Sequence, residues 1–330
     1  MKIAKETAKK ILIILLIVFG GLTLLGGIVF TIGFAAAGWS FSAFNTVNYE
    51  EAIYTETQEI TGISLEYDTT DIQVYFDETA TQVRVEYADK YTKSGKLLVK
   101  TYIKEGNGKL IIKQERTRPF YFENYIGEEN TTTLYLPANR TYALNMETDT
   151  GDIFFYGNAT LNGLELETDT GTINLNNCTL TCNGAIDISA STGDIFLNNF
   201  TAKSLELETS TGNITFSGNS AVEGRVEIEV STGDILLSHL SGESLLIRTS
   251  TGDVECGRKC VLDFTSIQIT TSTGDVYLNL IGKAADYSIQ THSNTGNVTL
   301  SGMADSSLPR QLTVRSSTGD IEGQFIPKNE

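Results

Sequence analysis

Acidic side chains recur at two fixed positions in the second half of the chain, four and six residues before a repeated glycine. They are Glu147, Glu165, Glu167, Asp187, Glu206, Glu208, Glu227 and Glu229. If their segments lie side by side as strands, the carboxylates stack about 5 Å apart and repel one another. Such a stripe attracts cations and predicts a site for divalent cations or a cationic peptide. A plain solvated face, screened by salt and water, is the alternative.

Four cysteines form two close pairs, Cys178 with Cys182 and Cys256 with Cys260. The spacing within each pair differs from the two-residue spacing common in zinc sites. The pairs are four repeats apart, which is too far for one four-sulfur site or for a bridge between the pairs. Each pair is therefore a possible disulfide within its own repeat, and a buried thiol is the alternative reading.

Other chemistry finds little support in the sequence. The two histidines, His239 and His292, lie in different repeats without the context of a catalytic triad. No repeat carries the Asp, Arg and Lys set of a polysaccharide-cleaving β-helix enzyme. The chain has a net charge of -17, and its first ten residues hold four lysines and one glutamate (+3), so the remainder carries -20. We therefore predict no enzyme activity, no cofactor and no nucleic-acid partner.

The acidic positions belong to a repeat. Thr-Gly followed by Asp, Asn or Thr and then by Ile or Val occurs nine times, at intervals of 19 to 23 residues. The glycines are Gly151, Gly171, Gly193, Gly212, Gly233, Gly252, Gly274, Gly296 and Gly319. A fixed period near 20 indicates one small unit that buries its apolar face only by stacking on its neighbours.

Each unit alternates apolar and polar residues on both sides of its glycine, as half-buried strands do. The inward positions change parity across the Thr-Gly step, which requires a corner in a conformation that glycine adopts freely. Strand, turn, strand and turn then repeat in register. The sequence predicts an all-β protein, a parallel β-solenoid (β-helix) of about nine rungs over residues 141–326.

The start of the chain has a different character. Residues 11–38 carry no charge and are long enough to cross a bilayer once as a helix. Four lysines precede them and glutamates follow, which places residues 1–10 in the cytoplasm and the repeats outside the cell. We expect a single-pass membrane protein with a transmembrane helix at 11–38 and a juxtamembrane linker at 39–58. A signal peptide cleaved near Ala35–Ala37 is the alternative.

Residues 59–140 form strands of another kind. Short apolar-alternating runs are separated by Ser94-Gly95 and Gly106-Asn107-Gly108, which are typical hairpin signals. Thr70 stands in a degenerate copy of the repeat turn, where glycine would be expected. We predict a mainly antiparallel β cap that covers the first rung, since an open solenoid end exposes unpaired edges.

Leu134-Tyr-Leu-Pro-Ala138 followed by Asp149-Thr-Gly-Asp152 and by repeated Ser-Thr-Gly-Asp units resembles the bacterial adhesin-like "toastrack" family over about residues 60–326. The resemblance implies a β-rich, often membrane-tethered protein of cell-envelope stress systems, and it brings no catalytic residues. A non-catalytic protein that binds or senses at the envelope, with an envelope-stress signalling protein as a possible partner, is the first hypothesis. A surface adhesin and a polysaccharide-active enzyme are the alternatives.

Overall fold

The computed structural model describes residues 46–117, 131–257 and 260–327, together with eight helical residues between 23 and 35. The predicted cytoplasmic tail, 1–10, and most of the predicted transmembrane helix, 11–38, lie outside the described residues. Among the residues that are described, no helix reaches the length and apolarity that a membrane crossing needs.

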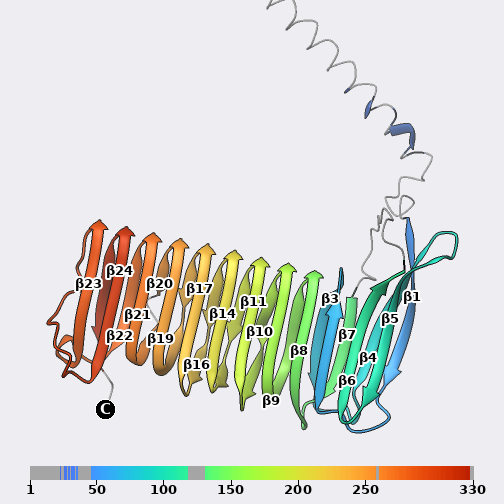
Figure 1. Cartoon of the computed structure of the whole chain (residues 1–330), viewed down its shortest axis with the longest axis horizontal. Helices are drawn as coiled ribbons and strands as arrows, with labels where there is room; N and C mark the ends of the chain where they lie inside the picture. Colours follow the sequence, from blue (N-terminus) through green and yellow to red (C-terminus); the bar gives the residue numbers. More distant parts are fainter. Residues whose placement is uncertain are drawn as a thin grey trace, which may run out of the picture.

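The described chain is almost entirely β-structure (Figure 1). The N-terminal strands are β1 Val47–Thr55, β2 Gly62–Tyr67, β3 Asp71–Asp77, β4 Arg84–Thr92, β5 Leu97–Gly106, β6 Lys109–Arg116 and β7 Thr131–Pro137. The repeats supply β8 Thr141–Thr150, β9 Ile153–Thr170, β10 Ile173–Cys182, β11 Ala185–Thr192, β12 Ile195–Asn198, β13 Phe200–Ala202, β14 Ser204–Thr211, β15 Ile214–Ser217, β16 Asn219–Val222, β17 Arg225–Thr232, β18 Ile235–Leu237, β19 His239–Thr251, β20 Val254–Cys256, β21 Leu262–Thr273, β22 Val276–Ile281, β23 Tyr287–Thr295, β24 Arg310–Thr318 and β25 Ile321–Ile326. One short 3-10 helix, η2 (Ala284–Asp286), precedes β23.

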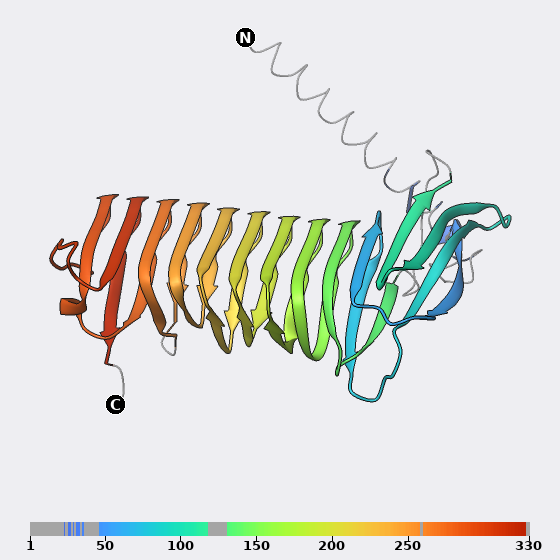
Figure 2. The same cartoon turned by 60° about the horizontal axis from the view of Figure 1, so that its bottom comes forward.

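The repeats form a parallel β-solenoid, as the sequence predicts. Strands of equivalent position pair in parallel and in register from rung to rung, as β11, β14 and β17 do. Figures 1 and 2 show the rungs stacked as one long rod. All nine predicted corners are present, and about eight turns of chain separate them.

The solenoid encloses one continuous apolar core. The inward columns on both sides of the glycines are almost fully buried, for example Leu205 and Leu207 before Gly212, and Ile214 after it. Period-two alternation puts these side chains on one face of each strand, and stacking covers them with the same residue types from the next rung.

The glycine corners are tighter than their conformation alone requires. Gly212 has φ +150°, and a Cβ placed there would lie 2.0 Å from the carbonyl oxygen of Gly193 in the neighbouring rung. At eight of the nine corners this distance to a neighbouring glycine oxygen is only 1.7 to 2.1 Å. The Thr209 hydroxyl donates a hydrogen bond to the same Gly193 oxygen at 3.2 Å. The corner therefore excludes any side chain at the glycine while it satisfies the carbonyl.

An Asp or Asn follows the glycine at eight of the nine corners and joins the rungs, whereas Thr172 follows Gly171. The Asn213 N–H donates to Asp194 Oδ1 at 2.7 Å, and the Asp234 N–H donates to Asn213 Oδ1 at 2.8 Å. The same bond recurs at most corners and links the neighbouring rungs there. A column that faces solvent thus contributes to the stacking through charge-assisted hydrogen bonds.

The predicted N-terminal cap is smaller than expected. Strands β2 and β3 pair in parallel with β8 and β9, and β6 and β7 pair in parallel with β2 and β3, so these four strands form rungs of the solenoid. Only β1, β4 and β5 add antiparallel pairings. Strands β2 and β3 join the solenoid because Thr70 forms a corner between them. Its carbonyl oxygen lies 2.4 Å from the Cβ position of Gly151, where the other corners have the carbonyl oxygen of a neighbouring glycine.

Strand β1 and two hairpins complete the N-terminal region. The predicted linker, 39–58, is described from residue 46 onward and contains strand β1, which pairs antiparallel with β4. Val47 of β1 packs with Leu98 and Val99 of β5. The hairpins expected at Ser94-Gly95 and Gly106-Asn107-Gly108 are present, and Asn107 and Gly108 have φ of 54° and 72°. A two-residue hairpin turn requires such positive values.

Near the C-terminus, rung order departs from chain order. Strand β24 pairs with β21 on one side and with β23 on the other, so the last rung in the sequence lies between its two predecessors. The corner glycines accordingly stack in the order Gly274, Gly319, Gly296. Strand β23 becomes the outermost rung at this end (Figure 1).

Candidate functional site

The predicted acidic residues lie in two adjacent columns on the outer face of one sheet, which we call the acidic stripe. In one column Glu165, Asp187, Glu206 and Glu227 are direct register partners. In the other column Glu147 pairs with Glu167, Ser189 interrupts, and Glu208 pairs with Glu229. Six of the eight side chains are exposed, while Glu227 and Glu229 are partly covered.

The stripe extends one rung further than the sequence analysis placed it. Glu66 of β2 is the register partner of Glu147. The signal was available in the sequence, because Glu66 stands four residues before Thr70, the position where the corner glycine is missing. An antiparallel cap would not place Glu66 beside Glu147, whereas the parallel pairing of β2 with β8 does.

Basic side chains close the stripe at both ends. Lys113 forms an ion pair with Glu66 at one end. At the other, Arg248 Nη1 lies 2.8 Å from Glu227 Oε1 and also contacts Glu229, and Arg225 contacts Glu227. Between these ends, Glu147, Glu165, Glu167, Asp187, Glu206 and Glu208 form no ion pair with any residue that the structure describes. The centre of the stripe is therefore a run of carboxylates without ion pairs, in which Glu165 accepts a hydrogen bond from Asn145 Nδ2 at 2.6 Å.

Partial burial and, after it, the neighbouring charges raise the pKa values of several of these carboxyls. Partial desolvation, followed by the charges of Glu167 and Glu66, raises the pKa of Glu147. Desolvation and then Glu165 raise the pKa of Asp187, and desolvation with Asp187 and Glu227 raises that of Glu206. Each of these groups gains by binding a proton or another cation.

The described carboxylates of the stripe are spread out rather than gathered at one point. Within the described part of the chain, no three His, Cys, Asp or Glu side chains converge as metal ligands. Neighbours in one column are separated by the strand spacing of about 4.8 Å, and residues two apart along a strand by about 6.8 Å. Such a lattice offers a field for an extended cation rather than a single coordination point.

A shallow groove of about 640 Å³ runs beside the stripe across five rungs. Its floor is made of small residues in one column, Gly62, Ala143, Gly163 and Ala185. Glu165 and Asp187 of the stripe form one edge, and Lys109 lies at one end. The groove gives apolar surface to a ligand whose cationic groups reach the stripe.

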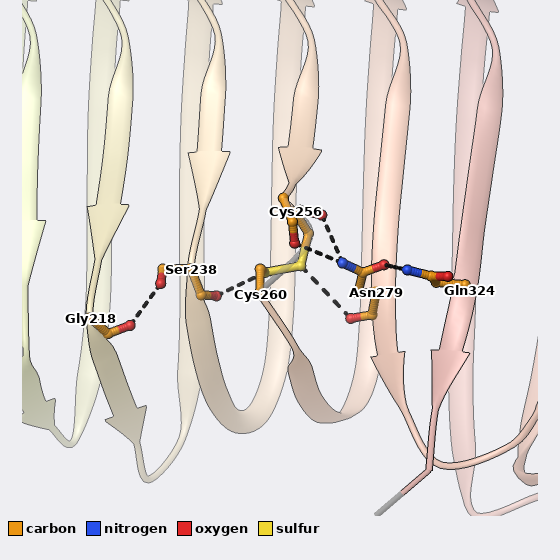
Figure 3. Close-up of a disulfide and its surroundings, with 7 residues drawn as sticks. Gly218, Ser238, Cys256, Cys260, Asn279 and Gln324 are labelled. Carbon is orange, nitrogen blue, oxygen red and sulfur yellow. Dashed lines mark hydrogen bonds between the residues drawn. A yellow bond between two sulfur atoms is a disulfide. The ribbon is translucent and has the colours of Figure 1, made fainter.

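One predicted cysteine pair is a disulfide. Cys256 and Cys260 are bonded with a Cα–Cα distance of 5.3 Å, since β20 ends at Cys256 and Cys260 lies outside any strand, where its N–H donates to Gly257 O at 2.8 Å. Figure 3 shows the polar side chains beside the disulfide. Buried Asn279 donates from Nδ2 to the carbonyls of Cys256 and Gly257 at 3.1 and 2.8 Å, and Gln324 Nε2 donates to Asn279 Oδ1 at 2.8 Å. The disulfide is thus a structural part of the C-terminal rungs.

The other pair is reduced. Cys178 and Cys182 both point into the core from strand β10, and each is 4% exposed. Four residues of extended strand span about 13 Å, which is beyond the reach of a disulfide. Burial raises the pKa of the Cys178 thiol to about 12, so it behaves as a small apolar side chain.

The two histidines and the stacked tyrosines of the described chain do not come together as a catalytic set. His292 Nε2 lies 2.8 Å from Asn294 Oδ1 on an exposed strand, and His239 lies in another rung. On the opposite face Tyr75 stacks between Tyr135 and Tyr156, with ring centroids 5.5 and 4.6 Å apart. The flat faces of Tyr75 are covered by its neighbours, so this ring offers no platform to a sugar.

A family model, described as Toastrack DUF4097, matches residues 60–324. This match covers the whole solenoid with its N-terminal rungs. The chain belongs to the Toastrack DUF4097 family. No curated protein matches this Toastrack chain.

Solved structures similar to this Toastrack chain have low sequence identity. A candidate cell adhesion protein from Clostridium sporogenes has 10% identity and a TM-score of 0.29, covering 84% of this chain and 100% of its own. A candidate adhesin from Bacteroides fragilis has 13% identity and a TM-score of 0.38, and the match covers 84% of this chain and 97% of the adhesin. A candidate lipid-binding protein from Parabacteroides distasonis has 10% identity and a TM-score of 0.45, and the match covers 86% of this chain and 97% of that protein. Likeness at this level transfers no function.

Proposed function

We propose that this Toastrack protein is a non-catalytic binding protein at the cell envelope, whose acidic stripe collects cationic ligands. The observation that carries the proposal is the run of six carboxylates without an ion pair to any described residue, bounded at each end by basic side chains. Charged columns in one fixed register raise the local concentration of polycations.

The structure favours one class of cation over the other. A divalent metal ion needs several oxygen ligands at one point, which the stripe does not provide among the described residues. An elongated cationic peptide can place successive charges over successive rungs and its apolar atoms in the adjoining groove. We therefore propose a cationic peptide as the ligand and expect calcium to act only by screening.

The cellular setting in this proposal comes from the sequence and the family. Residues 11–38 would anchor the protein in the cell membrane, with residues 1–10 in the cytoplasm and the solenoid outside. Binding at the stripe would then report on the envelope to a signalling protein. The charge distribution around residues 11–38 and the β-rich, repeat-built family support this setting.

A titration tests the binding. The protein is titrated with a lysine-rich peptide of about ten residues, and separately with calcium, beside the variant Glu206→Gln, Glu208→Gln, Glu165→Gln, Asp187→Asn. A matched control carries Glu223→Gln, Glu243→Gln, Glu255→Gln and Glu322→Gln, which remove the same charge from exposed positions outside the stripe. We expect at least tenfold weaker peptide binding in the stripe variant alone, and weaker binding at high salt. Equal affinity of the two variants for the peptide would mean that the stripe is ordinary solvated surface and not a binding site.

A further inference from the structure

The two ends of the solenoid are closed differently. At the N-terminal end β4 and β5 pair antiparallel with β7 and β6 and so cover the outermost rung. At the other end β23 is outermost, and within the described chain only β24 pairs with it as a strand. Figures 1 and 2 show β1 and β23 at opposite ends of the rod.

The end at β23 exposes the core. Val298 stands two residues after Gly296, and the equivalent residue of the eight other repeats is at most 1% exposed. Val298 itself is 37% exposed, and Met303, whose carbonyl accepts a hydrogen bond from the Ile289 N–H, is 73% exposed. The apolar column of the solenoid therefore reaches the surface here.

The backbone edge of β23 is also incompletely covered. At inner corners the glycine N–H donates outward to the next rung, as from Gly274 to Thr318 O and from Gly319 to Thr295 O, both at 2.9 Å. By the same geometry the Gly296 N–H points outward, where the described chain supplies no further rung. The loop that follows β23 forms hydrogen bonds only with the first half of the strand. The Ile289 N–H donates to Met303 O, and the Thr291 hydroxyl donates to Leu300 O. Such an edge is a template for another strand.

The charge of this end suits a second copy of the same chain. Residues 282–310 contain two basic residues, Lys283 and Arg310, and two acidic ones, Asp286 and Asp305, a sum of zero in a chain of -17. Two acidic stripes would repel each other, whereas two neutral ends meet without this cost.

We propose that the distal tip, residues 291–298 with Met303, pairs with the distal tip of a second copy. Because β4 and β5 cover the outermost N-terminal rung, the rung that matches the open β23 rung is that of another tip, and the contact is isologous with two-fold symmetry. The free halves of the two β23 edges run antiparallel, and Val298 and Met303 of each copy are buried in the contact. This pairing does not depend on the acidic stripe.

Sedimentation of the full chain in mild detergent tests the proposal. We expect a dimer for the wild type and at least a tenfold larger dissociation constant for Val298→Glu with Met303→Glu, at an unchanged melting temperature. The matched control is Leu236→Glu, which alters an apolar side chain 41% exposed at mid-solenoid and should leave the dimer intact. A monomeric wild type, or a dimer that survives both tip substitutions, overturns the proposal.

Cross-linking locates the contact. A cysteine introduced at exposed Asn294, on the tip, should join two chains through a short bis-maleimide, while one at exposed Ser231, at mid-solenoid, should not. The native cysteines are buried or disulfide-bonded and do not compete. Equal cross-linking at both positions would show random collision and contradict a specific tip contact.

Discussion

The corner glycine is the residue on which the fold depends most. Its repetition predicted a turn that disfavours a side chain, and the positive φ of Gly212 agrees. The sequence could not show that the Cβ position is filled by the carbonyl of the neighbouring rung. That contact exists only when two rungs stack, so no single repeat encodes it.

Replacing Gly212 with Ala should therefore lower the free energy of unfolding by about 2–4 kcal/mol, through backbone strain and displacement of the Gly193 carbonyl. Gly163→Ala is the control, because its Cβ would meet only Ala185 O, at 4.0 Å. That change should be within about 0.5 kcal/mol of neutral. Chemical denaturation followed by circular dichroism compares the two variants. Equal effects would mean that the corner tolerates a side chain.

At the scale of elements, strands were predictable and their order was not. Period-two alternation located the strands of the repeats, and glycine-containing turn signals located the hairpins around Gly95 and Gly108. All repeats carry the same corner, so their sequences do not say which rung stacks on which. The inserted rung β24 and the parallel rungs β2 and β3 thus became visible only in the structure.

For the cysteine pairs too, the sequence predicted the candidates and only the structure shows which pair is bonded. Both have the same spacing, yet only Cys256–Cys260 is bonded, because one pair flanks a loop and the other lies within a strand. Spacing alone left both outcomes open. The path of the backbone between the two residues decides which pair can close.

Removing the disulfide through Cys256→Ser with Cys260→Ser should cost about 2 kcal/mol of stability, the loop-closure value for so short a loop. Reductant should lower the wild-type unfolding midpoint and leave that of this variant unchanged. Cys178→Ala with Cys182→Ala is the control, since these thiols form no disulfide and the variant should keep the response to reductant. A wild type indifferent to reductant would show that the bond adds nothing.

For the whole molecule, the distribution of charge matters more than its total. The sequence predicted the acidic columns, since their offset from the glycine is constant. It did not predict the groove beside them, which depends on small residues from four neighbouring rungs coming together. The result is a rod with an acidic, grooved flank and a neutral tip, and the two surfaces suit different partners.

The stripe should make stability depend on pH. The pKa values of Glu147, Asp187 and Glu206 are raised, so the folded protein binds more protons than the unfolded chain. Stability should then rise as pH falls from 7 toward about 4.5, where these groups protonate even when unfolded. Glu105 acts oppositely. Desolvation would raise its pKa, but hydrogen bonds from Thr57 and Gln58 hold it at about 2, and their stabilisation is lost only below about pH 4.5.

A maximum of the unfolding midpoint is therefore expected between about pH 4.5 and 6 at low salt. Glu147→Gln with Asp187→Asn and Glu206→Gln should flatten the rise between pH 7 and 5, because the repelling charges are gone. Glu223→Gln with Glu243→Gln and Glu255→Gln should keep it, since these exposed residues lie outside the stripe. High salt should flatten the wild-type curve as well. If both variants follow the wild-type slope, the rise does not come from the stripe.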